Sequence, residues 1–121
     1  MAAASTRLIG YGPGRFQLAE DRFVDGSLLL LPDGPHDWAA TDVTALQVED
    51  FDALIAQKDR IDVLFIGCGS AMMPLPKPVR LALEDAGLGY ELMETGAACR
   101  AFNVLLDEGR RVAAALIALP K

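Results

Sequence analysis

Two cysteines are the side chains of this sequence with the most direct capacity for covalent chemistry. Cys68 follows an apolar run at 61–66, and Cys99 lies shortly after Thr95, where a helix is expected to begin. If the strands before them are parallel neighbours, both thiols lie at the carboxyl edge of one sheet, where open α/β folds place ligands. A helix N-terminus, with Arg100 alongside, would then lower the pKa of Cys99. The competing interpretation is two small buried side chains, because the sequence has no Cys-x-x-Cys motif and a single His.

The glycine loop Gly67-Cys68-Gly69 is a second candidate, for phosphate binding. Dinucleotide-binding loops use G-x-G-x-x-G to carry the pyrophosphate directly onto a helix N-terminus. Here Met72 stands at the third glycine position, and the prolines within 74–78 delay the next helix. The backbone amides are therefore not gathered at a helix start. We interpret the loop as a tight exit from a buried strand and expect no cofactor.

Three polar residues share one face of the helix expected after Thr95. Arg100, Asn103 and Asp107 follow at i, i+3 and i+7, opposite an apolar stripe that includes Phe102. They form either a solvated face with a weak Asn–Asp contact or a recognition surface. In the second case Arg100 would anchor a carboxylate or the backbone of a partner. Elsewhere, Trp38 is expected to fold back onto the core rather than to form a binding spot with His36.

The first third of the chain reads as β-structure. We expect short strands at 8–11 and 16–18 around a turn at 12–14, and a longer strand at 22–31 that ends in four leucines. The prolines at 32 and 35 predict that this strand stops and that 32–42 is irregular.

The remaining two thirds alternate between helix and strand. Apolar spacing at 48–55 predicts a helix, with Thr44 and Gln47 as a possible capping box. Strands are expected at 61–66, 89–93 and 111–119, with a helix ending at Gly87 and another with Thr95 as its N-cap. Successive strand–helix–strand units favour parallel strands with right-handed crossovers. The prediction is a single α/β domain over residues 1–121, with a mixed sheet, N-terminal antiparallel strands and a disordered tail at 1–6.

Composition narrows the classes of function. The 121 residues carry a net charge of −6, and 52% of them are apolar, which suffices for one packed core. An acidic balance argues against nucleic acid and anionic membranes as partners. Two cysteines and one histidine leave no disulfide framework and no histidine-rich metal site. The longest apolar run, at 112–119, is too short to span a bilayer, and the N-terminus has no signal-like or transit-like pattern. We expect a soluble cytoplasmic protein with reduced thiols.

Four stretches together resemble one known family. They are GYGPG at 10–14, GSLL at 26–29 leading to Trp38, LFIGCG at 64–69, and ETGAACRAFN at 94–103 continuing through Leu105 to EGR at 108–110. These stretches cover nearly the whole chain and resemble domain of unknown function 498, the family that contains the eukaryotic NADH dehydrogenase (complex I) assembly factor 3 proteins. The last stretch, T-x-x-A-C-R-x-x-N-x-L-x-x-E-G-R, is the specific one. The resemblance implies a compact three-layer α/β domain.

The resemblance also implies a role. Eukaryotic members are non-catalytic assembly factors bound to partner proteins, whereas prokaryotic members have no assigned activity; this chain looks like a stand-alone bacterial member. The family's loop usually reads G-T-G, so Cys68 at its middle position argues against an essential thiol there. Positions matching the motifs suggest a binding site that comprises Gly67, Gly69, Thr95, Cys99, Arg100 and Asn103.

Two hypotheses follow. The leading one is a non-enzymatic protein-interaction module whose partners include membrane or respiratory complex subunits. The alternative is a small-molecule-binding protein or enzyme, with its site at the carboxyl edge around 67–69 and 95–103. In that case Cys99 or Arg100 would be the working group.

Overall fold

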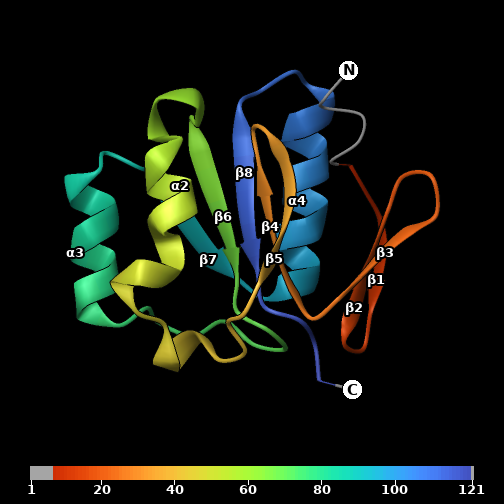
Figure 1. Ribbon diagram of the computed structural model, residues 1–121, viewed down its shortest axis with the longest axis horizontal. Helices are drawn as coiled ribbons and strands as arrows, with labels where there is room; N and C mark the ends of the chain where they lie inside the picture. Colours follow the sequence, from red (N-terminus) through yellow and green to blue (C-terminus); the bar gives the residue numbers. More distant parts are fainter. Residues whose placement is uncertain (1–6, 121) are drawn as a thin grey trace.

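The strands of the chain are divided between two sheets. The structure is a computed structural model that describes residues 7–120, so the disordered tail expected at 1–6 lies outside the described residues. An antiparallel sheet has the order β1-β2-β3 and a mixed sheet the order β5-β4-β8-β6-β7 (Figure 1). The strands are β1 (Leu8–Gly12), β2 (Arg15–Leu18), β3 (Arg22–Asp25), β4 (Ser27–Leu31), β5 (Gly34–Trp38), β6 (Val63–Gly67), β7 (Tyr90–Met93) and β8 (Val112–Leu116).

The mixed sheet has the expected antiparallel and parallel parts. β4 pairs antiparallel with β5 and β8, whereas β6 runs parallel to β7 and β8. The helical segments are the 3-10 helices Val43–Ala45, Val48–Phe51 and Lys58–Arg60 and the α-helices α2 (Asp52–Ala56), α3 (Lys77–Asp85) and α4 (Thr95–Asp107). The predicted α/β class, with antiparallel N-terminal strands followed by alternating helices and strands, is confirmed.

The prediction of one long strand at 22–31 is wrong. Gly26, with φ +84°, separates β3 from β4, and its N–H donates to the carbonyl of Gly14 at 2.9 Å. A residue in this left-handed conformation interrupts an extended run, and glycine adopts it without steric cost. The chain therefore leaves the three-stranded sheet and enters the five-stranded sheet within this single stretch.

The expected irregular segment at 32–42 also contains a strand. β5 pairs with β4 over its whole length, with Pro35 opposite Leu30. Proline lacks the N–H that an inner strand needs, but β5 is the outermost strand of its sheet, where proline is tolerated. Trp38 at the end of β5 is buried, and its Nε1 donates to the carbonyl of Asp50 at 2.9 Å. The prediction that Trp38 packs onto the core is confirmed.

The helix predicted at 48–55 is a 3-10 turn that continues into α2, and its cap is not the predicted one. The Thr44 N–H donates to Asp42 Oδ1 at 2.9 Å, and the Gln47 N–H donates to Asp50 Oδ2 at 2.8 Å. Asp42 is therefore the N-cap of Val43–Ala45, whereas Gln47 is the N-cap of Val48–Phe51 and forms a capping box with Asp50 rather than with Thr44.

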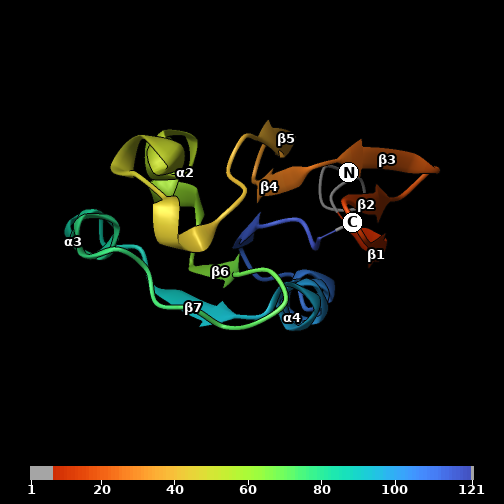
Figure 2. The same ribbon diagram turned by 90° about the horizontal axis from the view of Figure 1, so that it is seen from below.

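Two apolar cores lie on opposite faces of the five-stranded sheet. Along β6, Leu64 and Ile66 enter the core under α2 and α3, whereas Phe65 enters the core under α4. This alternation follows from the period of two in a strand. Figure 2 shows α2 and α4 on opposite sides of β6. The three-stranded sheet contributes Phe16 to the core on the α4 side, so that one domain with three layers results. Among the described helices, none combines the length and apolarity that crossing a bilayer requires.

Candidate functional site

The two cysteines do not form one site. β6 and β7 are parallel neighbours, as expected, but Cys68 belongs to the core under α2 and α3. Cys99 belongs to the core on the α4 side. Cys68 directly follows β6 and Cys99 lies on the helix that follows β7, as expected for the carboxyl edge, but the two thiols are buried on opposite faces of the sheet.

Of the two interpretations of the cysteines, the one as small buried side chains is confirmed, and the activation considered for Cys99 is contradicted. Its side chain is buried, and burial raises the pKa of the thiol to about 12, because a thiolate loses its hydration there. The neighbouring charge of Arg100 acts in the opposite direction and is the smaller influence. Burial therefore favours the neutral thiol over the thiolate, which is the nucleophilic form.

Gly67, Gly69 and Thr95 meet where β6, β8 and α4 converge. Thr95 is fully buried, and its Oγ1 donates to the carbonyl of Ile117 at 2.7 Å and accepts the Gly69 N–H at 2.9 Å. The Thr95 N–H donates to the carbonyl of Gly69 at 2.8 Å. Glu94 occupies the N-cap position predicted for Thr95, which is the first residue of the helix. The threonine thus links the helix start to two strand ends.

This junction is filled by the chain itself. A Cβ at Gly67 would lie 2.9 Å from both Cα and Oγ1 of Thr95, so glycine is required by close packing. Gly69 adopts φ +94°, a conformation that favours glycine. Within residues 7–120, no buried side-chain nitrogen or oxygen lacks a hydrogen-bond partner. The three motif residues therefore hold strands and helix together.

The polar face of α4 lies against β1. Asn103 binds both backbone polar groups of Leu8, at 3.1 and 2.8 Å, and Asp107 pairs with Arg7 at 2.9 Å. One turn of helix earlier, Arg100 Nη1 donates to the hydroxyl of Tyr11 at 2.9 Å. Much of this face is thus occupied by the N-terminal strand of the same chain rather than simply solvated.

Tyr11 was not among the residues chosen from the sequence, although it lies in the GYGPG motif. A Cβ at Gly96 would come within 2.5 Å of the Tyr11 hydroxyl oxygen, so the tyrosine packs directly on the first turn of α4. The side chain of Arg100, which donates to the same hydroxyl, is 65% exposed. Its Nη2 lies 3.9 Å from Glu94 Oε1. Of the predicted site residues, Arg100 is the one that remains accessible.

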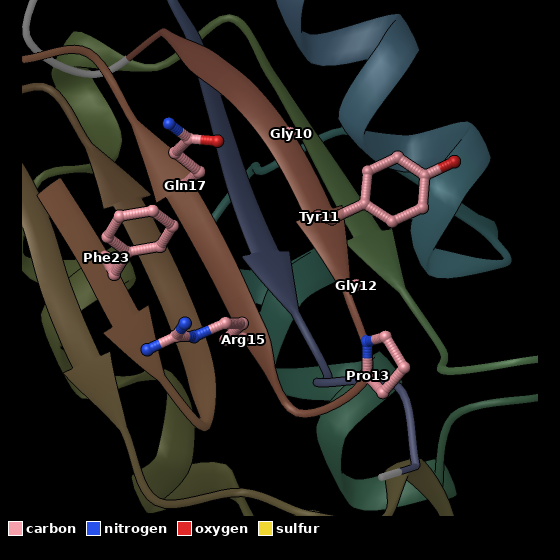
Figure 3. Close-up of a pocket in the computed structure, with 7 residues that line it drawn as sticks. All are labelled: Gly10, Tyr11, Gly12, Pro13, Arg15, Gln17 and Phe23. Carbon is pink, nitrogen blue, oxygen red and sulfur yellow. The ribbon is translucent and has the colours of Figure 1, made fainter. Parts of the chain in front are cut away.

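The outer face of the three-stranded sheet forms a shallow hollow of about 280 Å³, which we call the outer shelf (Figure 3). Two cross-strand rows supply this face: Gly10–Gln17–Phe23 and Gly12–Arg15–Asp25. Tyr11, whose ring lies toward α4, and Pro13, just after the end of β1, complete its lining. Phe23 is 51% exposed, which is unusual for a large aromatic side chain in a strand.

Arg15 dominates the electrostatics of the outer shelf. Its guanidinium lies 4.6 Å from the centre of the Phe23 ring, a cation–π arrangement. Its Nε lies 3.2 Å from Asp25 Oδ1, and both side chains are largely exposed. An exposed pair of this kind contributes about 0–1 kcal/mol, so Asp25 holds Arg15 only weakly.

Neither a metal centre nor a histidine site emerges from the described residues. Between residues 7 and 120 no three His, Cys, Asp or Glu side chains gather in a way that would hold a metal ion. His36 Nε2 lies 2.7 Å from Asp33 Oδ1 at the surface, and this hydrogen bond lowers the pKa of Asp33.

Comparison with known proteins identifies relatives over the whole fold. Residues 8–117 match the family model described as "Protein of unknown function (DUF498/DUF598)". An uncharacterized protein of Rhodobacter capsulatus is 38% identical over 98% of this chain and 89% of its own length. The NADH dehydrogenase [ubiquinone] 1 alpha subcomplex assembly factor 3 of Danio rerio is 31% identical, over 98% of this chain and 68% of its own.

A solved structure agrees with the architecture. The crystal structure described as an outer membrane protein from Bartonella henselae is 36% identical and superposes with a TM-score of 0.89, covering 98% of this chain and 99% of that one. The resemblance found in the motifs is thereby confirmed, and the arrangement of both sheets is shared with an experimentally determined structure.

Proposed function

Because the chain belongs to the DUF498/DUF598 family, we propose that it is a cytoplasmic, non-catalytic interaction module that assists the assembly of a respiratory NADH dehydrogenase. The animal relatives are named as assembly factors for such a complex. The observation that carries the proposal is the outer shelf, where an aromatic side chain and bare strand backbone face solvent. Exposed apolar surface of this kind is typical of protein contacts.

The alternative, an enzyme or small-molecule binder at the carboxyl edge, has less support. Such an enzyme needs an accessible reactive group, whereas Cys99 is buried with its pKa raised to about 12. It also needs space at the strand ends, whereas Thr95 fills the space beside Gly67. Arg100 remains as a surface group, which suits contact with a protein.

Deletion of the gene in the native host tests the proposal. Membranes of the deletion strain are analysed on native gels for assembled NADH dehydrogenase and for NADH oxidation. We expect both to fall and to recover with the wild-type gene. A Cys99→Ala gene should restore them equally, because an interaction module does not use the thiol. Unchanged NADH dehydrogenase in the deletion strain would contradict the assembly role, and failure of Cys99→Ala at normal protein level would favour the enzyme.

A further inference from the structure

We propose that the outer shelf binds an extended segment of a partner protein that presents one carboxylate between apolar side chains. This inference rests on the proposed function and specifies the chemistry of the partner. The carboxylate would bind Arg15, an apolar side chain would pack on Phe23, and the backbone would pass over Gly10 and Gly12.

Two glycines of β1, Gly10 and Gly12, line the outer shelf. The φ angles of Gly10 and Gly12 lie outside the left-handed region, so their conformation does not require glycine. A Cβ at Gly12 would meet nothing within 4 Å, and one at Gly10 would meet only the Gln17 side-chain oxygen at 3.7 Å. Packing inside the chain therefore does not require glycine either.

Glycine inside a strand nevertheless has a cost, about 0.5–1 kcal/mol relative to alanine. A glycine inside a strand often marks a bulge, or a place where another backbone or a ligand approaches closely. The pairing of β1 with β2 shifts register between Leu8 and Gly10, so a bulge accounts for Gly10, whereas Gly12 pairs in regular register with Arg15 and points to a close approach. Gly10 and Gly12 alternate with Tyr11, so they lie on the same face of β1, beside Gln17 and Arg15. The glycines thus leave a strip of backbone without side chains along the outer shelf.

The charge of Arg15 indicates which kind of segment binds the outer shelf. Among the residues that line the hollow, Arg15 is the charged one, and Asp25 lies beside it on the same face, although the chain as a whole carries −6. In the described part of the chain its only ion pair is the weak one through Nε to Asp25, whose side chain is 78% exposed. A partner carboxylate can therefore bind the terminal nitrogens of Arg15 in the bidentate geometry that guanidinium favours.

The acidic remainder of the molecule limits this partner. A strongly acidic segment would be repelled by the net charge of −6, whereas one carboxylate among apolar residues matches one guanidinium beside Phe23. Arg100 donates to the Tyr11 hydroxyl but lies 3.9 Å from Glu94, so Arg15 remains the positive charge that the outer shelf offers. The partner segment thus complements the charge of Arg15 alone and not the net charge of the molecule.

Selection from a phage-displayed library of random linear peptides tests the inference. The whole chain is the bait, and the Gly12→Val variant removes peptides that bind elsewhere. We expect the enriched peptides to contain one Asp or Glu flanked by aromatic or aliphatic residues. Failure to enrich such peptides, or enrichment of peptides without an acid, would overturn the proposal.

The dissociation constants of the enriched peptides, synthesised with a fluorescent label, sharpen the test. Arg15→Glu and Gly12→Val should each weaken binding by about tenfold or more, the former through charge reversal and the latter by filling the shelf. Matched controls are Arg80→Glu on α3 and Gly89→Val before β7, since both residues are exposed and lie outside the outer shelf. Gly12→Val should also raise the melting temperature, because the fold does not need this glycine. Equal affinity of all four variants would overturn the inference.

Complementation separates this inference from the proposed function. In the deletion strain, a Gly12→Val gene should produce normal protein but fail to restore assembled NADH dehydrogenase. Full restoration would overturn the outer shelf as the docking site and leave the assembly role intact. If deletion itself has no effect, the assembly role fails, and peptide affinity alone decides for or against the outer shelf.

Discussion

The side-chain amide of Asn103 binds Leu8 as a neighbouring strand would. Its Oδ1 accepts the Leu8 N–H at 3.1 Å, and its Nδ2 donates to the Leu8 carbonyl at 2.8 Å. Adjacent strands exchange the same two bonds in a hydrogen-bonded pair. A helix thus covers the edge of β1 and leaves it less open to pairing with another chain.

Asn103→Ala should lower the free energy of unfolding by about 1–3 kcal/mol, because it leaves two partly buried backbone groups of Leu8 without partners. Urea unfolding measures the difference. The neighbouring Val104→Ala is the control, since Val104 is 55% exposed and should change stability by less than about 0.5 kcal/mol. Equal effects of the two substitutions would show that the amide pairing contributes nothing.

Thr95→Val should destabilise the protein considerably more than Thr95→Ser. Valine conserves the shape but leaves the Gly69 N–H and the Ile117 carbonyl unpaired in a buried position, at roughly 1–3 kcal/mol for each group. Serine retains the hydroxyl and loses one methyl group, worth about 1 kcal/mol. Chemical denaturation of both variants decides. A valine variant as stable as the serine variant would contradict the role given to this hydroxyl.

The thiol of Cys99 should resist alkylation in the native protein. Its pKa is raised to about 12 by burial, so iodoacetamide should react at neutral pH only as fast as the protein opens. A Cys68→Ala background isolates this thiol, and mass spectrometry follows the modification over time. Labelling as fast as that of a small free thiol would contradict the burial of Cys99.

The same shift predicts a dependence of stability on pH. Because the folded-state pKa of Cys99 lies above the ordinary value of 9.0, its contribution is fully present below pH 9.0 and is lost as the pH rises toward 12. Relative to Cys99→Ala, the wild type should lose up to about 1.4 kcal/mol per pH unit in this window. Parallel unfolding of both proteins below and above pH 9.0 measures it. A constant difference would contradict the shift.

The turn between β2 and β3 offers a stabilising substitution. Glu20 and Asp21 adopt φ of 63° and 58°, which L side chains adopt at a cost. Glu20→Asn with Asp21→Gly should raise stability by about 1 kcal/mol, since these residues accept positive φ. Thermal unfolding tests this, with Glu49→Asn, in a 3-10 helix with ordinary φ, as control. An unchanged melting temperature would indicate that the turn is not strained.

Local sequence patterns predicted the class of the fold because hydrophobic spacing and turn residues determine most strands and helices within a few consecutive residues. Leu28–Leu31 was expected to be covered on both faces, and Leu29 and Leu31 do enter one core while Leu28 and Leu30 enter the other. The break at Gly26 was missed because a run of strand-forming residues does not reveal which sheet each half joins. The strand at Pro35 was missed because the proline rule depends on whether a strand is an edge, which only the assembled sheet decides.

The candidate site was harder to predict because its contacts are remote in sequence. Tyr11 and Arg100 are separated by 89 positions, and Leu8 and Asn103 by 95. Helical spacing correctly placed Arg100 and Asn103 on one face, but it contained no information that β1 covers this face. Likewise, adjacency of β6 and β7 did not determine the face of the sheet on which each cysteine lies.

The position of β8 has a consequence for synthesis on the ribosome. β8 follows all other described strands in the chain, yet it lies between β4 and β6 in the middle of the five-stranded sheet, and all five of its residues are buried. Until β8 emerges, β4 and β6 each keep an unpaired edge, and both cores lack the side chains of the central strand. The domain therefore completes its fold only after translation has passed Leu116. A nascent chain stalled before Val112 should remain a target for chaperones and proteases, because its apolar strands stay exposed.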